Sequence, residues 1–229
     1  SGAYRLDGLA LAFDKARITA SGGFSPNEAS GKVSVDNVPL PLLALFGLAG
    51  IDGTASLTAS LSGSPARPQL TAEANLSGVR LAAEKGEGLP SLAVRAQAAV
   101  NGTRLDVSAA VSSKGKAEAV TVTAGAPLRL SLAPFAFDMP SNGALSGQVR
   151  ADADLADLAT VLARVNTRLA GRLTADLALG GTLAAPTASG ALALAASRLE
   201  NADAGLVLTN VTLAAQAAGG VLTITKASG

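Results

Sequence analysis

The sequence predicts a mainly β protein: an elongated, antiparallel-rich sheet, folded over into a hydrophobic groove, with two short amphipathic helices. Three observations lead to this fold class. Residues 171–179 alternate strictly between apolar and polar side chains; a related segment lies 118 residues earlier (171 minus 53); and an Asn-Gly pair at 101–102 separates two further alternating runs.

The segment 171–194, GRLTADLALGGTLAAPTASGALAL, contains the clearest strand. Leu173, Ala175, Leu177 and Leu179 are separated by single residues, so in a strand they share one face. Gly180-Gly181 and Pro186 interrupt the pattern and predict a turn. A second strand follows, with Leu192 and Leu194 on its apolar side.

The segment 53–76, GTASLTASLSGSPARPQLTAEANL, repeats this pattern. Gly53 corresponds to Gly171, Gly63 to Gly181 and Pro68 to Pro186. Repetition at a fixed distance is typical of an elongated array of units that stack along the chain.

The composition agrees with an extended apolar surface that lacks large anchoring side chains. Of the 229 residues 48% are hydrophobic but only 3% are aromatic, and the net charge is +1. This balance gives no electrostatic argument for nucleic acid. The chain has no Cys and no His, so cysteine-based metal sites and Ser-His-Asp triads are excluded.

At the amino-terminal end, short alternating runs predict strands that belong to the end of a preceding β-repeat, residues 1–37. The run VPLPLLALFGLAG then begins at Val38. Two prolines suit a helix entrance, so we expect a short helix over 39–47. This apolar stretch is too short to span a bilayer.

The clearest sequence pattern for a β-hairpin covers residues 92–111. Leu92 and Val94 lie in the run before Asn101-Gly102, and Val107 lies in the run after it. Asn-Gly favours the tight turns of β-hairpins because both residues tolerate positive φ. The sheet is expected to continue through three further pairs of alternating residues: Val120 and Val122, Leu128 and Leu130, and Leu145 and Val149.

A second helix is predicted over 155–168. Asp154 suits its N-cap, and Leu155, Leu158, Leu162 and Val165 recur at three- and four-residue spacing. We therefore divide the remainder into a first β-groove repeat at 38–153 and a second at 154–229. Gly219-Gly220 is expected at the tip of the last hairpin.

About fifteen strands spaced at about 4.8 Å would give a sheet about 70 Å long. Two short helices cannot cover its apolar face, so we expect the sheet to fold across its width into a trough that is apolar inside and polar outside. An ordinary closed sandwich core is the alternative, because periodicity does not distinguish the two. The expected groove-lining residues are Ala55, Leu57, Ala59, Leu61, Leu92, Val94, Val107, Val120, Val122, Leu128, Leu130, Leu145, Val149, Leu173, Ala175, Leu177, Leu179, Leu192 and Leu194.

The helix, strand and hairpin order of each unit resembles the TamB family, the inner-membrane-anchored subunit of the translocation and assembly module, and is similar to the AsmA-like proteins. The residues that carry the resemblance in the second unit are Gly171, Leu173, Leu177, Leu179, Gly181, Thr182, Leu183, Pro186, Gly190, Leu192 and Leu194. The first unit departs from the pattern with Ser64-Pro65 and Ala72. The resemblance implies a β-taco groove in the periplasm of a Gram-negative envelope and an outer-membrane partner of the Omp85 type. The chain is then expected to be an internal fragment of an anchored protein.

Three functions remain open, and none of them is enzymatic. The groove could carry phospholipid acyl chains between the membranes, support unfolded outer-membrane proteins as a holdase-like platform for their assembly and secretion, or form a purely structural β-repeat stalk. No base for a nucleophilic Ser is signalled. The acidic residues near 152–157 lack the spacing of a calcium loop, so strand polarity and helix capping explain them. We expect no catalytic residue, no metal site and no cofactor.

Overall fold

The computed structural model describes residues 2–42, 50–81, 91–113, 118–156, 167–201 and 203–229. This part of the chain contains fifteen β-strands and no α-helix. The strands are β1 (Tyr4–Phe13), β2 (Ala16–Phe24), β3 (Ala29–Pro39), β4 (Ile51–Ser64), β5 (Arg67–Leu81), β6 (Leu92–Asn101), β7 (Arg104–Ser113), β8 (Glu118–Pro127), β9 (Arg129–Leu132), β10 (Phe135–Asp138), β11 (Ser146–Asp154), β12 (Thr167–Gly181), β13 (Pro186–Asn201), β14 (Leu206–Ala218) and β15 (Val221–Ser228). The predicted mainly β, antiparallel fold class is confirmed.

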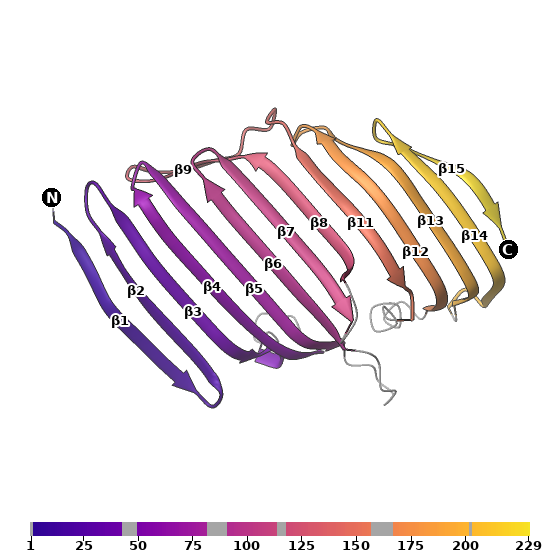
Figure 1. Cartoon of the computed structure of the whole chain (residues 1–229), viewed down its shortest axis with the longest axis horizontal. Coiled ribbons are helices and arrows are strands. Elements are labelled where there is room, and N and C mark those ends of the chain that lie inside the picture. The colour runs from indigo at the N-terminus through magenta and orange to yellow at the C-terminus, as the bar shows by residue number, and fades with distance from the viewer. Residues whose placement is uncertain (1, 43–49, 82–90, 114–117, 157–166, 202) are drawn as a thin grey trace.

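Thirteen strands form one sheet in which the spatial order follows the chain (Figure 1). Each strand pairs antiparallel with the next, except that β8 pairs with β11. At about 4.8 Å between strands, the twelve intervals make the sheet about 58 Å long. Short turns suffice for such a meander, because antiparallel neighbours begin where the previous strand ends.

The register aligns the alternating sequences of all thirteen strands. Directly opposed residues share a face, so each apolar position lies beside apolar positions in the neighbouring strands. We call one such line the central apolar row. It runs through Leu11, Ile18, Val35, Leu57, Ala74, Ala96, Ala109, Val122, Val149, Leu177, Gly190, Ala217 and Leu222. The side of the sheet that carries this row is the apolar face, and the opposite side is the polar face.

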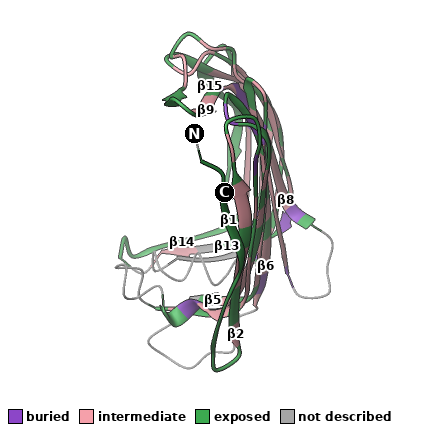
Figure 2. Ribbon diagram, turned by 90° about the vertical axis from the view of Figure 1, so that its left-hand side faces the viewer, coloured by how far each residue is buried: buried purple, intermediate pink, exposed green. Residues whose placement is uncertain are grey.

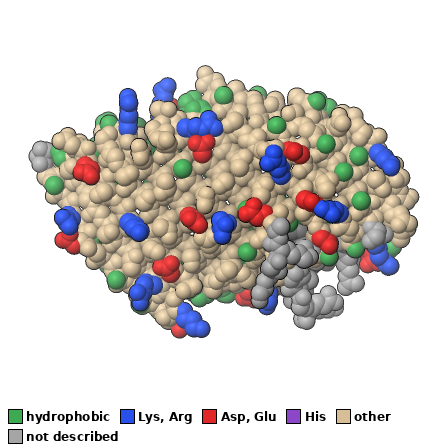
Figure 3. Space-filling model, in the orientation of Figure 1, with side chains coloured by type: hydrophobic (Ala, Val, Ile, Leu, Met, Phe, Trp, Pro, Cys, Tyr) green, Lys and Arg blue, Asp and Glu red, His purple; other side chains and the backbone are tan. Residues whose placement is uncertain are grey.

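The sheet is curved along its strands. Viewed from its end, it forms an arc (Figure 2). The charged side chains are spread over the face that is turned to the viewer in Figure 3, which is the convex side of this arc. The apolar face is therefore the concave one.

β-bulges account for part of this curvature. Register shifts interrupt seven strand pairs, and five of them, β3–β4, β4–β5, β5–β6, β7–β8 and β12–β13, have the shift toward the edge of the sheet where β3, β5 and β7 end. An extra residue in one strand bends it and increases its local twist. Repetition of the bulge in neighbouring strands bends the sheet as a whole.

The two predicted repeats have the same local geometry at their corresponding glycines. Gly53 and Gly171 have φ of 126° and 150°, and Gly63 and Gly181 have φ of 97° and 77°. A Cβ on Gly53 would approach the carbonyl oxygen of Ser77, and one on Gly171 would approach that of Ala195. Ser77 and Ala195 are again 118 residues apart (195 minus 77), so the sequence repeat is also a conformational repeat.

The helix predictions need correction where the structure describes them. Residues 40–42 form a short 3₁₀ turn, and 43–49 lie outside the described residues. Leu155 and Ala156 form a turn in which the backbone N–H of Ala156 donates to the Asp154 carboxylate at 3.0 Å. Residues 157–166 lie outside the described part. Thr167 and Arg168, predicted as the helix end, begin β12 because the ladder with β13 provides their partners.

The expectation that Leu128 and Leu130 continue the main sheet was wrong. Leu130 lies in β9, which pairs only with β10 among the described strands. This hairpin lies along one edge of the sheet on the concave side (Figures 1 and 2). The backbone N–H of Leu132 donates to the Pro65 carbonyl at 2.7 Å, and Leu128 is almost fully buried where the chain leaves β8.

The predicted unit boundaries lie within strands. The 37/38 boundary lies within β3, and the 153/154 boundary lies at the last residue of β11. The sheet continues across both without a break in strand order. The division into 1–37, 38–153 and 154–229 remains a prediction about sequence units.

Candidate apolar binding face

The apolar face is built from several parallel rows. Beside the central apolar row, a second row runs from Leu9 to Ala188 through Val33, Ala59, Ala72, Ala98, Val107, Ala124, Gly147 and Leu179. A third row on the other side runs from Val38 to Ile224 through Ala55, Leu76, Val94, Val111, Val120, Ala151, Ala175, Leu192 and Ala215. Together they form a strip of small and branched apolar side chains across the sheet.

Most predicted groove residues lie in these rows or directly beside them. Leu61 is opposite Leu70, Leu173 is opposite Leu194, and Leu92 pairs with Val79 at the bulged end. Leu145 precedes β11, where its backbone N–H donates to the Gly181 carbonyl at 3.0 Å. The structure thus brings the predicted set together on one face, apart from Leu128 and Leu130 at the β9–β10 edge.

The apolar face is only partly covered in the described structure. Leu57 and Val107, near its middle, are each 39% exposed. Eleven hydrophobic residues are buried, and six of them are alanines, so the described chain has no large central core. Scattered exposed leucines are normal in proteins, whereas a continuous exposed apolar strip is typical of an interaction surface.

The polar face carries short-range hydrogen bonds between neighbouring strands. Ser60 and Thr71 hydroxyls are 2.6 Å apart, and Thr54 and Ser77 hydroxyls are 2.8 Å apart. Cross-strand hydroxyl pairs of this kind stabilise a solvent-facing sheet surface. Their positions show why Ser and Thr alternate with the apolar residues in the sequence.

Two ion pairs on this face connect the adjacent strands β11 and β12. Arg172 donates twice to the Asp152 carboxylate, with both N···O distances 2.6 Å. This hydrogen bonding, followed by the charge of Arg172, holds the pKa of Asp152 below its ordinary value. Both groups are solvent-exposed, so the pair has a modest effect on stability. It marks the polar face as the side that faces water.

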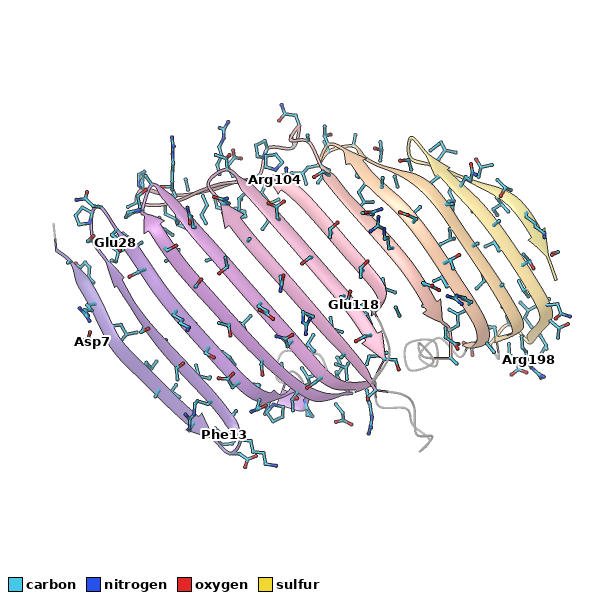
Figure 4. The ribbon with its side chains drawn as sticks, viewed as in Figure 1. Asp7, Phe13, Glu28, Arg104, Glu118 and Arg198 are labelled. Atoms are coloured by element: carbon cyan, nitrogen blue, oxygen red, sulfur yellow. The ribbon has the colours of Figure 1, made fainter. Side chains whose placement is uncertain are left out.

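The side chain of Arg104, which is labelled in Figure 4, reaches across strand β8 on the polar face. Its guanidinium donates to Asp106 at 2.7 Å and to the Ser146 hydroxyl of β11 at 2.7 Å. The side chain passes over Gly125 of β8, where an added Cβ would lie 2.0 Å from the guanidinium. Gly125 thus leaves room for this contact, which joins β7 to β11.

A cavity of about 550 Å³ lies against the same part of the polar face. One row of directly opposed residues lines it: Thr58, Glu73, Gln97, Ser108 and Thr123. Arg104 and Ser146 also line it. Ala99 and Gly125, which have little or no side chain, also line it. It offers hydroxyls, amides and paired charges, whereas the opposite face offers apolar side chains.

The sequence-based site list missed several members of the apolar face. Ile18, Val33, Val35, Leu76 and Val111 lie in its rows although they were not among the predicted groove residues. The same alternation marks them in the sequence. The sequence alone does not give the register between neighbouring strands, because that register depends on the β-bulges. The Arg104 contact carried no sequence signal, because it joins residues 42 positions apart.

No protein-family model, curated protein or solved structure matches the chain. No helix in the described residues is long and apolar enough to cross a membrane. The described part also contains no cluster of three or more acidic, His or Cys residues suited to a metal ion.

Proposed function

We propose that this chain is a hydrophobic groove module that holds phospholipid acyl chains on its apolar face. The observation that carries the proposal is the central apolar row, which crosses thirteen strands without a charged or polar side chain. The half-exposed side chains along it favour an open, folded-over groove over a closed sandwich core. The concave curvature supports the same proposal, because it gives an acyl chain contacts on more than one side.

The energetics suit a ligand that moves along the face. Burial of one methylene contributes about 0.8 kcal/mol, so a 16-carbon chain could gain up to about 12 kcal/mol. A single deep pocket would retain such a ligand. Rows of similar Leu, Val and Ala side chains instead offer nearly equal environments at successive strands. An acyl chain could then slide from strand to strand while its headgroup stays in water.

The cellular setting of the proposal comes from the resemblance to the TamB family. On that basis the module belongs to a periplasmic bridge between the inner and outer membranes, and an outer-membrane protein of the Omp85 type joins it through other parts of the full-length protein. The same resemblance connects the groove to outer-membrane biogenesis. The holdase-like platform and the purely structural stalk stay as alternatives to it. The bridge is expected to act without catalysis and without a cofactor.

A matched pair of arginine substitutions tests the proposal. Leu177→Arg places a charge in the central apolar row, and Ala178→Arg places the same charge on the exposed polar side of the same strand. Binding of a pyrene-labelled phosphatidylglycerol to the purified chain is measured by fluorescence, with circular dichroism as the folding check. We expect Leu177→Arg to weaken binding by about tenfold or more, because a buried guanidinium must be desolvated or moved aside.

Ala178→Arg should leave the affinity unchanged. Equal affinities for the two folded variants would contradict the groove assignment. Failure of the parent chain to bind the lipid, together with binding of an unfolded outer-membrane β-barrel protein, would favour the holdase-like alternative. Binding of neither would leave the structural stalk as the better account.

A further inference from the structure

The β9–β10 hairpin lies across the ends of several strands of the main sheet. The backbone N–H of Leu128 donates to the Thr103 carbonyl at 2.9 Å, and that of Leu132 donates to the Pro65 carbonyl at 2.7 Å. Thr103 lies in the β6–β7 turn, and Pro65 lies in the β4–β5 turn. The hairpin is therefore attached at two turns of one sheet edge, on the concave side of that edge (Figures 1 and 2).

Burial indicates which part of the apolar face this hairpin covers. A fourth row of directly opposed residues lies nearest to the same edge: Leu61, Leu70, Val100, Leu105 and Ala126. Val100 and Ala126 in this row are buried, whereas Val107, two residues further along β7 in the second row, is 39% exposed. The hairpin thus covers the fourth row and leaves the second row open beside it.

The two faces of the hairpin differ in polarity. Four apolar side chains share one face, because directly opposed residues lie on the same side: Leu130, Leu132, Phe135 and Phe137. Arg129 is opposite Asp138 on the other face. Since charged groups stay in water, the apolar side of the hairpin is the one that faces the groove.

The aromatic half of this apolar side is open. Phe135 and Phe137 are 76% and 60% exposed, whereas Leu130 and Leu132 opposite them are partly buried. Only 3% of the chain is aromatic, yet two of its five phenylalanines lie in this four-residue strand. Exposed aromatic side chains that continue an apolar surface are typical of a contact site.

We propose that Phe135 and Phe137 form a side wall of the groove and contact an acyl chain that lies on the second row. This inference rests on the proposed lipid-binding function. Apolar side chains border the space from the wall and from the row, and the backbone groups of the strands below are used in the sheet ladder. A polypeptide would leave its own N–H and C=O groups without partners there, whereas an acyl chain has none.

Tryptophan fluorescence tests this contact, since the chain has no tryptophan of its own. Phe137→Trp places a single reporter in the wall, and Ala136→Trp places one on the polar face of the same strand. Leu177→Trp places one in the central apolar row. Each variant is titrated with phosphatidylglycerol that carries bromine atoms on its acyl chains, which quench a tryptophan on contact. We expect loss of fluorescence for Phe137→Trp and Leu177→Trp, and little loss for Ala136→Trp.

The three reporters separate failure of the wall from failure of the groove. Quenching of Leu177→Trp without quenching of Phe137→Trp would overturn the wall and leave the proposed function intact. Quenching of neither would contradict the proposed function, and the wall with it. Equal quenching of Ala136→Trp and Phe137→Trp would overturn the assigned orientation of the hairpin.

Alanine substitutions test whether the wall contributes to affinity. Phe135→Ala combined with Phe137→Ala should weaken binding of pyrene-labelled phosphatidylglycerol by about tenfold, because two aromatic rings lose their contact with the acyl chain. Asp138→Ala, on the other face of β10, should leave the affinity unchanged. Circular dichroism checks that both variants are folded. Unchanged lipid affinity in the folded double variant would overturn the proposal, and an accompanying loss of binding to an unfolded outer-membrane β-barrel protein would assign the wall to a polypeptide.

Discussion

The glycines shared by the two repeats permit close approaches between neighbouring strands. At Gly171, an added Cβ would lie 2.2 Å from the Ala195 carbonyl oxygen, and the backbone φ of 150° is one that side chains rarely adopt. Gly53 repeats this contact with Ser77 at 2.7 Å. The bend of the strand at these positions thus depends on the absence of a side chain.

Substitution of Gly171 by alanine should destabilise the chain more than a substitution at a glycine with free space. We expect Gly171→Ala to lower the free energy of unfolding by about 3 kcal/mol, from backbone strain and the clash with a fixed carbonyl. Gly102 also has positive φ, but no atom lies within 4 Å of its added Cβ. Gly102→Ala should therefore cost only about 1 kcal/mol.

Urea denaturation of the two variants measures this difference. Equal losses of stability would mean that strand β12 relaxes around the added methyl group. In that case the conserved geometry of the two repeats would not be set by these glycines.

At the scale of elements, the β9–β10 hairpin is attached to the sheet through a small buried contact. Leu128, directly before β9, is 2% exposed, and its backbone N–H donates to the Thr103 carbonyl at 2.9 Å. Phe135 in β10 is 76% exposed despite its size. The buried leucine, and not the exposed aromatic residue, should stabilise this edge.

Leu128→Ala tests this attachment. The loss of a fully buried leucine side chain should lower the free energy of unfolding by about 3 kcal/mol. Phe135→Ala should change it by less than about 0.5 kcal/mol, because an exposed side chain loses little burial. Thermal or urea unfolding followed by circular dichroism compares the two. A larger effect of Phe135→Ala would show that the hairpin is held by its aromatic side.

Alternation and turn residues predict most strands of this fold. The 92–111 hairpin has its turn at Asn101-Gly102, and β14 and β15 meet at Gly219-Gly220, as expected. The β9–β10 hairpin was missed because four-residue strands contain too few alternations to differ from a continuation of the main sheet. At Thr167 and Arg168, leucine spacing in the preceding residues suggested a helix, whereas pairing with β13 determines the local structure.

The existence of an apolar face was predictable from the sequence, but the residues that form it were only partly predictable. The alternation assigned Leu57 and Leu177 to an apolar side. Their membership of one row depends on every intervening pair and bulge between β4 and β12. Such long-range register is not encoded in the spacing of any single segment. The curvature that makes the apolar side concave likewise depends on bulges in several strands at once.

At the scale of the whole molecule, the sheet separates two environments across its thickness. Ion pairs and hydroxyl pairs lie on the convex face, over which Figure 3 shows the charged side chains, while the apolar rows lie on the opposite face. A large apolar surface that the described residues leave partly exposed is typical of a site that binds a partner. In our proposal, acyl chains are that partner.

Site-specific photo-cross-linking in a Gram-negative cell tests this central claim most directly. A photoreactive amino acid is placed at Leu57, Val122 or Leu177, which share the central apolar row, and at Ala178 on the polar face as the control. After irradiation, mass spectrometry of the purified protein identifies attached lipid. The account predicts phospholipid adducts at all three row positions and none at Ala178. Adducts absent from the row, or equally abundant at Ala178, would contradict it.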